Sequence, residues 1–322
     1  MTYTSGGLIQ ATDYNGFVST TSGANVNNVW STGSVDAGWG QPALSTVAAT
    51  NTITATQWAT LVNTLINMGG QTGTTITVRT PPTAGTTIGI LAALNTDLTN
   101  ITANRQNAAA NGTQFTGYTG TNSKTAATSG SPWSITFTNT VTWASADAAR
   151  YFFNAGGRIK IDVSKTSTGA TGDPEWNDLA NTLCGDIFIT GGTATQTIAG
   201  TAYTGTTKIG GTGTPNTLAT TTGWYDLTAG AAATIVYKQF ADTAPYTANF
   251  IQHSIAKGAS SNTLVITTLW SASDGDPITG GTAASGATPG TAPCTICTYF
   301  PPSSTYLSTT SWGTPTVAAT TA

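Results

Sequence analysis

Charged side chains are scarce in this chain: only 7% of its 322 residues are Asp, Glu, Lys or Arg, whereas an ordinary soluble domain has about a quarter. Histidine and glutamate occur once each, as His253 and Glu175. With so few groups that exchange protons, the chain is poorly equipped for acid–base catalysis. Its 10 basic residues are scattered and form no patch that would neutralise a phosphate backbone, so we expect no nucleic-acid partner.

Long apolar segments are absent as well. No run approaches the ~20 residues that a membrane-spanning helix needs, so we expect no membrane insertion. Residues 1–8 lack a basic segment followed by an apolar core, which argues against a signal peptide. A composition typical of extracellular proteins without an export signal suggests release by cell lysis.

Cysteine is the next scarce residue, with only Cys184, Cys294 and Cys297. The last two have the CxxC spacing of redox motifs and of half a zinc site. A zinc site needs about four ligands, and the other cysteine and His253 are distant in sequence. Prolines on both sides of the motif predict a loop, not the start of a thioredoxin-like helix. We therefore expect Cys294 and Cys297 to form a local or inter-subunit disulfide or to remain free thiols, with no metal and no cofactor.

Threonine takes the place of the missing charges, since 72 residues are threonine. Its β-branched side chain favours a pleated sheet, and its hydroxyl keeps an exposed strand hydrated without adding charge. A surface with little charge favours association between copies. The composition therefore favours a structural or adhesive β-rich protein over an enzyme.

The N-terminal part of the chain predicts an arm followed by two helices. Residues 1–50 are punctuated by glycine and predict an extended arm. Residues 51–111 predict a helical hairpin, whose first helix starts at a capping box formed by Thr54 and Gln57 and stops at Gly69-Gly70. The second helix begins near Thr87 with heptad spacing, so a short bundle around an oligomer axis is the alternative.

The rest of the chain predicts β-structure. Residues 112–132 are rich in Thr, Gly and Ser and predict a linker. Residues 133–270 predict an antiparallel β-sandwich, because apolar and hydroxyl residues alternate from Trp133 to Trp143 and further strands follow at short spacing. Residues 271–322 predict an irregular C-terminal tail. The expected fold is therefore mainly β with a small α-helical N-terminal part.

Four tryptophans in loop-like segments are the candidate contact residues. On exposed loops, their rings would contact a neighbouring subunit or, alternatively, form a platform for a glycan. We favour subunit contacts for Trp30, Trp39, Trp224 and Trp312.

Other polar residues have simpler explanations than catalysis or metal binding. Paired carboxylates hydrolyse glycans in some enzymes, and the candidates are Asp173/Glu175/Asp178 and Asp274/Asp276. The first group suits the start of a helix, and the second suits a turn, with calcium as the alternative. His253 has no triad partners, so we expect it to pack or to face solvent. The sequence thus predicts no catalytic residue and no metal site.

Several segments resemble one family. Residues 150–162 read Arg-Tyr-Phe-Phe-Asn-Ala-Gly-Gly-Arg-Ile-Lys-Ile-Asp. This run resembles the R-x-F-F-N-x-G-G-x-I stretch of virion structural proteins of tailed bacteriophages, many of them labelled tail-fibre-like. Further segments similar to the same group follow one order, at 7–15, 30–41, 53–61 and 246–270. The threonine content and the tail with Cys294 and Cys297 depart from the pattern.

The resemblance implies a non-enzymatic structural component of a tailed-phage virion. Such a protein is associated with a fibre, the neck or the tail, is built as a homo-oligomer, and has other virion proteins as partners. It would be assembled in the host cytoplasm and released in the virion by lysis. The alternatives are a glycan-binding adhesin, that is, a receptor-binding module for a host surface glycan, and a capsid decoration protein; a glycan depolymerase is a further alternative.

Overall fold

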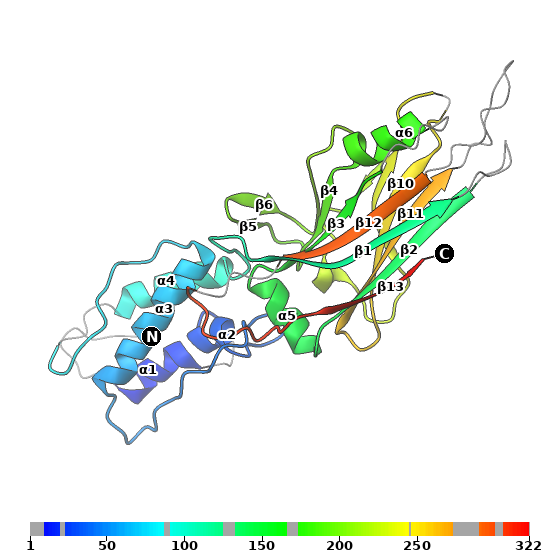
Figure 1. Cartoon of the computed structure of the whole chain (residues 1–322). Helices are drawn as coiled ribbons and strands as arrows, with labels where there is room; N and C mark the ends of the chain where they lie inside the picture. Colours follow the sequence, from blue (N-terminus) through cyan, green and yellow to red (C-terminus); the bar gives the residue numbers. More distant parts are fainter. Residues whose placement is uncertain are drawn as a thin grey trace, which may run out of the picture.

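Two antiparallel sheets pack face to face in the computed structural model and form a β-sandwich, as predicted (Figure 1). The five-stranded sheet has the order β1 (Gln114–Lys124), β12 (Gly290–Tyr299), β3 (Arg158–Val163), β4 (Asp186–Ile189) and β7 (Thr206–Ile209). The six-stranded sheet has the order β13 (Thr316–Thr321), β2 (Trp133–Thr142), β11 (Thr263–Ala272), β10 (Phe250–Lys257), β9 (Thr234–Phe240) and β8 (Thr217–Leu218). The structure describes residues 10–19, 23–86, 91–124, 133–165, 173–244, 246–272, 290–299 and 305–321.

Alternation of side chains decides which face of each strand is buried. In β11, every second residue from Leu264 to Ala272 is buried, and in β2 the buried set includes Phe137 and Val141. These side chains meet Ile159 and neighbouring isoleucines of β3 and β4 in one hydrophobic core. The period-two pattern of residues 133–143 therefore predicted β2 and its inner face correctly.

The helical end contains α1 (Ala11–Val18), α2 (Val26–Trp30), α3 (Ala55–Thr72) and α4 (Leu91–Ala103). The predicted capping box is present, because Thr54 Oγ1 accepts the Gln57 N–H at 3.2 Å and Gln57 Oε1 accepts the Thr54 N–H at 2.8 Å. The predicted stop at Gly69-Gly70 is wrong. Both glycines lie inside α3, and the helix ends at Gly73, whose φ of +68° is the left-handed conformation that closes helices.

The prediction of an extended arm over residues 1–50 is also wrong, because this segment contains α1 and α2. Asp13 Oδ2 accepts the Gln10 N–H at 2.9 Å at the start of the first helix. The rings of Tyr14 and Phe17 then pack edge-on against Trp58 of α3, with centroids 5.7 and 6.1 Å apart. Tertiary packing of these rings stabilises a helix that is too short to form by itself.

Two further segments were predicted to be irregular but form strands. The predicted linker, 112–132, contains β1, and the predicted tail, 271–322, contains β12 and β13. Threonine explains both errors, since the same residue suits a loop and a β-strand. Residues 305–321 leave the helical end, pass α5 (Ala146–Asn154) and join the six-stranded sheet at β13 (Figure 1).

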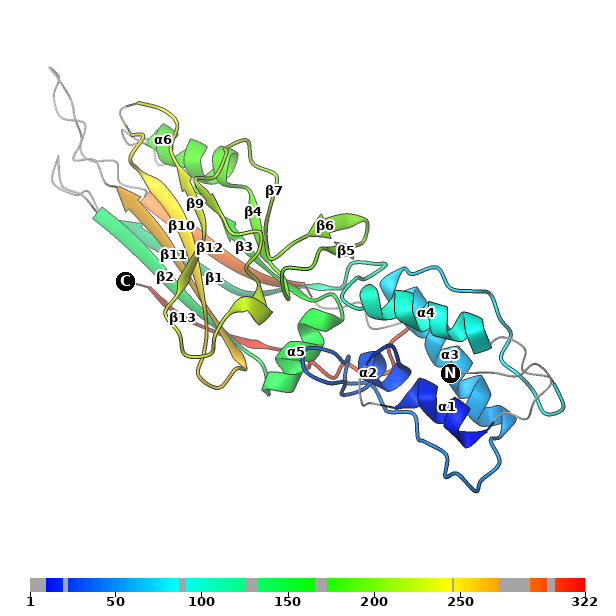
Figure 2. The ribbon, with the colours of Figure 1, turned by 180° about the vertical axis from the view of Figure 1, so that it is seen from behind.

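The remaining elements cover the margins of the sandwich. The hairpin of β5 (Gln196–Ile198) and β6 (Thr201–Tyr203) lies on the side nearer the helical end. At the opposite end, α6 (Asp173–Asn177) continues into a π-helical turn, η1 (Asp178–Cys184), and η2 (Trp224–Asp226) is a short 3₁₀-helix. Figure 2 shows the molecule from behind, with the six-stranded sheet nearer the viewer and its outer face free of the labelled helices.

Candidate functional site

The four candidate tryptophans lie in the core and not on exposed loops. Their exposed fractions are 6% for Trp30, 0% for Trp39, 3% for Trp224 and 2% for Trp312. The prediction of an exposed aromatic platform is therefore wrong. The glycine-rich segments fold back onto the chain, so these rings find within one molecule the apolar contacts that the sequence suggested between molecules.

Trp39 connects the helical end to the sandwich. Its Nε1–H is shared between the Arg105 carbonyl oxygen, at 3.0 Å after α4, and the Asn154 carbonyl oxygen, at 3.1 Å at the end of α5. Its ring meets Trp30 edge-on at 6.3 Å. Ser311 Oγ, from the C-terminal segment, donates to the Trp39 carbonyl oxygen at 2.6 Å. One buried residue thus joins segments that are distant in sequence.

The CxxC motif lies in β12 and not in the predicted loop. In the five-stranded sheet, Cys294 is opposite Val163 and Cys297 is opposite Lys160. The structure describes the backbone of this strand but not its side chains, so the disulfide stays a prediction. Asp274 and Asp276 lie outside the described residues altogether.

Glu175 is the most perturbed member of the predicted carboxylate group. It is 5% exposed, and its Oε1 has no hydrogen-bond partner among the described residues. Burial raises the pKa of the Glu175 carboxyl to about 7, and the charges of Asp178 and Asp242 act in the same direction. A raised carboxyl pKa is a property of general acids, but Glu175 is enclosed and lines neither of the grooves described below.

His253 packs inside the sandwich, which was one of its two predicted positions. It is 0% exposed, its Nδ1 lies 3.0 Å from Thr268 Oγ1, and its ring stacks on Tyr237 at 5.3 Å. Burial lowers the pKa of His253 to about 3, because the charged form is poorly solvated there. The side chain is therefore a neutral core residue near pH 7.

A polar groove opens where residues 31–38 meet α5. It has a volume of about 410 Å³, which is within the range of ligand pockets. Its lining includes Val35, Asp36, Arg150, Trp224 and Lys257. We call it the junction groove, because it lies between the helical end and the sandwich.

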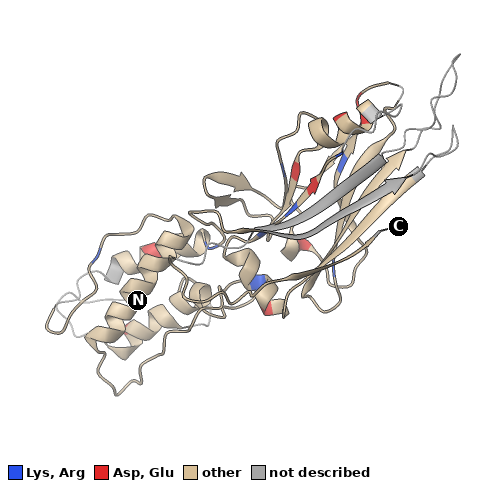
Figure 3. Cartoon of the chain, in the orientation of Figure 1, with Lys and Arg blue, Asp and Glu red and all other residues tan. Residues whose placement is uncertain are grey.

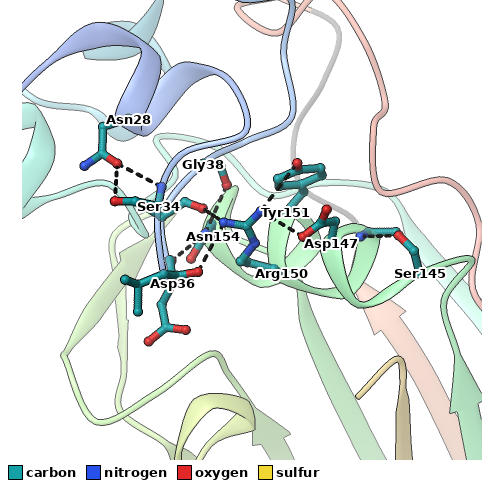
Figure 4. A network of polar contacts seen from close by, with 12 residues as sticks. Asn28, Ser34, Asp36, Gly38, Ser145, Asp147, Arg150, Tyr151 and Asn154 are labelled. Atoms are coloured by element: carbon teal, nitrogen blue, oxygen red, sulfur yellow. Dashed lines mark hydrogen bonds and ion pairs between the residues drawn. The ribbon is translucent and has the colours of Figure 1, made fainter. Parts of the chain in front are cut away.

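Two side chains of α5 hold the loop that forms one wall of this groove (Figure 4). Arg150 donates to the carbonyl oxygens of Ala37, at 2.6 Å, and of Val35, at 3.2 Å. One turn later, Asn154 Nδ2 donates to the carbonyl oxygens of Asp36, at 2.8 Å, and of Gly38, at 3.0 Å. Residues four apart lie on one helix face. A single face of α5 therefore makes all four hydrogen bonds to the loop.

The loop includes a strained and exposed residue. Val35 has a φ of +52°, a left-handed conformation that is costly for a β-branched side chain. Its side chain is 86% exposed. Packing within the folded chain therefore does not offset the strain.

Two groups of opposite charge, Asp36 and Lys257, border the junction groove. Among the described residues, neither Asp36 nor Lys257 has an ion pair within 4.0 Å. Lys257 Nζ lies 4.5 Å from the centroid of the Trp224 ring, and burial lowers its pKa while Asp36 and Asp226 oppose the shift. Figure 4 shows the Asp36 carboxylate pointing away from the hydrogen-bond network.

A second groove, of about 500 Å³, lies at the helical end. Its lining combines hydroxyls of α3, such as Thr56 and Thr60, with Leu44, Tyr14 and Trp30. Both rings are almost fully buried, at 2% and 6% exposed. The groove thus offers hydroxyls but no open ring face for a sugar.

The outer face of β13, β2 and β11 is uncharged and rich in hydroxyl groups, with Val265, Leu269 and Ala318 between them. None of these three strands contains a charged residue. The register places Thr138 between Thr320 and Thr267, and Thr142 between Thr316 and Thr263. Along β2, every outward position from 134 to 142 is a serine or threonine. We call this surface the threonine face.

The outer face of the other sheet differs, because ion pairs and a cation–π contact occupy it. Lys160 lies 3.3 Å from Asp162 and from Asp186, and the Arg158 guanidinium lies 4.9 Å from the Tyr203 ring centroid. Figure 3 shows charged residues of both signs along the strands of this sheet. The two faces of the sandwich therefore have different chemistry.

Comparison of the chain with protein-family models, with curated proteins and with solved structures finds no match. In the described part of the chain, no helix is long and apolar enough to cross a membrane. Nor do the described residues bring together three or more His, Cys, Asp or Glu side chains that would hold a metal ion.

The sequence predicted part of the threonine face and little of the junction groove. The alternation in β2 predicted an outward row of hydroxyls, but only the register with β11 and β13 places further threonines on both sides of that row. The junction groove has a weaker signal, because its walls come from residues around 35, 150, 224 and 257. A single sequence does not reveal that such distant segments meet.

Proposed function

We propose that this chain is a non-enzymatic structural component of a tailed-phage virion, part of a fibre, the neck or the tail, and that it works as a homo-oligomer. The observation that carries the proposal is the threonine face: an outer sheet face of three strands without a charged residue. The protein would be assembled in the host cytoplasm and would leave the cell in the virion by lysis.

A second copy of the same sheet is the surface that fits the threonine face best. Sheets twist with a fixed hand, and two equally twisted sheets pack face to face at about −30°. Each threonine hydroxyl both donates and accepts a hydrogen bond, and each threonine methyl adds apolar area. Without charges, two identical faces do not repel each other across a two-fold axis.

The stretch that resembles phage virion proteins also has structural roles in this fold. Arg150 and Asn154 hold the loop of residues 35–38. Gly156 has a φ of +97°, and a Cβ at Gly157 would lie 2.5 Å from the Phe152 carbonyl oxygen. Backbone geometry and packing thus explain these residues without a catalytic role, which supports a structural function.

Replacement of Thr138 by lysine tests the proposal. Thr138→Lys places a positive charge at the centre of the threonine face, where it would oppose the same charge of a second copy. We expect association measured by analytical ultracentrifugation to weaken by about tenfold or more, with an unchanged fold.

Thr99→Lys is the matched control, because Thr99 is exposed on α4 at the helical end. This variant should associate like the wild type. A wild-type chain that stays monomeric at high concentration and alongside particle partners would overturn the proposal. Equal association of Thr138→Lys and the wild type would remove the threonine face as its basis.

The tryptophan-based adhesin alternative loses its support, because all four rings are buried. The groove at the helical end has no charged residue in its lining, but its two aromatic rings, Tyr14 and Trp30, are almost fully buried. The proposed structural function is therefore favoured over glycan binding.

A further inference from the structure

We propose that the junction groove is a second contact between copies of this chain, in which Val35 of one copy enters the groove of the other and Asp36 pairs with Lys257. This inference rests on the proposed homo-oligomer and adds a specific interface to it. The occupant is a second copy of the chain, and the contact is symmetric.

Val35 supplies the first argument. A β-branched residue with a positive φ is strained, and residues of this kind persist where the surrounding structure holds them, often at functional sites. Here Arg150 and Asn154 hold the loop around it, while the Val35 side chain is left 86% exposed. The fold therefore presents a rigid apolar side chain to solvent, and burial of this side chain in a second copy would be favourable.

Charge supplies the second argument. Asp36 is exposed, and Lys257 borders the same groove; neither has an ion pair within 4.0 Å among the described residues. Within one chain, Lys257 contacts the Trp224 ring, and Asp36 and Asp226 act on its pKa without an ion pair within 4.0 Å in the described part of the chain. The acidic and the basic group therefore remain available for a closer pair across a two-fold axis. Asp147 and Arg150, also in the groove, already pair with each other at 2.9 Å.

Adjacency supplies the third argument. In a two-fold contact the same patch serves both partners, so a projecting residue and its receiving groove must lie side by side on one surface. Val35 itself lines the junction groove, as do Asp36 and Lys257. An axis through this patch would form two Val35 insertions and two Asp36–Lys257 pairs. The loop is already held in place, so little ordering is needed on association.

Exchange of the two charges tests the contact. Asp36→Lys and Lys257→Glu, each alone, place like charges opposite each other in both symmetric pairs. We expect each variant to associate about tenfold more weakly than the wild type in analytical ultracentrifugation. An equal mixture of the two variants should regain association as a heteromer, because both intermolecular pairs then join opposite charges.

The mixture separates contacts between copies from contacts within one chain. Inside each single variant, residues 36 and 257 still carry like charges, so an intramolecular effect would not be rescued by mixing. Failure of the mixture to regain association would overturn this inference. If the wild type associates but neither variant weakens it, the inference fails while the proposed homo-oligomer stands; a monomeric wild type contradicts both.

Val35→Asn is expected to stabilise the folded chain and to weaken association between copies. Asparagine tolerates the left-handed conformation better than valine, so the melting temperature should rise by a few degrees. Association should weaken by about tenfold, because the apolar side chain is lost. Val78→Asn is the matched control, since Val78 is 95% exposed without a positive φ; it should change neither quantity. Unchanged association of Val35→Asn would contradict the insertion of Val35.

Discussion

Acidification from pH 7 to pH 4 is expected to lower the free energy of unfolding by about 3 kcal/mol through His253 alone. The unfolded chain takes up a proton near the ordinary pKa of 6.5, whereas burial lowers the pKa of folded His253 to about 3. Between these values the unfolded state binds more protons. The stabilising contribution of the neutral ring is therefore full above pH 6.5 and is lost as the pH falls toward 3.

Urea denaturation at several pH values measures this effect. His253 is the only histidine, so His253→Gln removes the titration and leaves an amide next to Thr268. The variant should be less stable at pH 7, but its stability should fall much less on acidification. A wild-type curve parallel to that of the variant between pH 7 and pH 5 would show that His253 is solvated in the folded protein.

The titration of Glu175 changes the free energy of unfolding with pH in the opposite direction, so its contribution must be separated from that of His253. Its pKa is raised from 4.5 to about 7, so the folded state binds more protons than the unfolded state in this window. Stability from this group falls as the pH rises from 4.5 to 7. The comparison is therefore cleaner in a Glu175→Gln background, where the remaining slope above pH 5 belongs to His253.

Trp39→Ala is expected to lower the free energy of unfolding by about 3–5 kcal/mol. The substitution removes a fully buried ring and leaves a cavity between the helical end and the sandwich. It also removes the N–H that the carbonyl oxygens of Arg105 and Asn154 share. Both the cavity and the unpaired carbonyl groups destabilise the folded chain.

Trp39→Phe separates these two contributions. Phenylalanine fills much of the space but has no N–H donor, so we expect a loss of about 1–2 kcal/mol. Thermal and urea denaturation of both variants measure the difference. A loss below about 1 kcal/mol for Trp39→Ala would mean that the ring is exposed, as the sequence had suggested.

Local signals predicted a large part of the fold. Thr54 and Gln57 predicted the start of α3, because a capping box depends only on residues three apart. The alternation from Trp133 predicted β2 and its buried face for the same reason. Where the pattern and the contact lie within one element, the sequence is sufficient.

Non-local contacts explain the errors. The sequence around Trp39 indicates an exposed loop, because its partners after α4 and at the end of α5 are distant in sequence. In the same way, α1 is stabilised by packing of Tyr14 against Trp58 of α3. β12 has no alternating pattern of its own and pairs with β1 and β3 across long separations. The candidate site follows the same rule, since the hydroxyls were visible in the sequence but their register was not.

The position of β12 has a consequence for the way the chain folds. This strand lies between β1 and β3, which precede it by many residues in sequence, and β13 likewise adds to β2. Neither sheet has its full set of neighbours until these late segments arrive, and closing such long loops is entropically unfavourable. Chains with many distant pairings fold slowly. We therefore expect slow maturation, during which unpaired strand edges are available to other chains and a chaperone would be of most use.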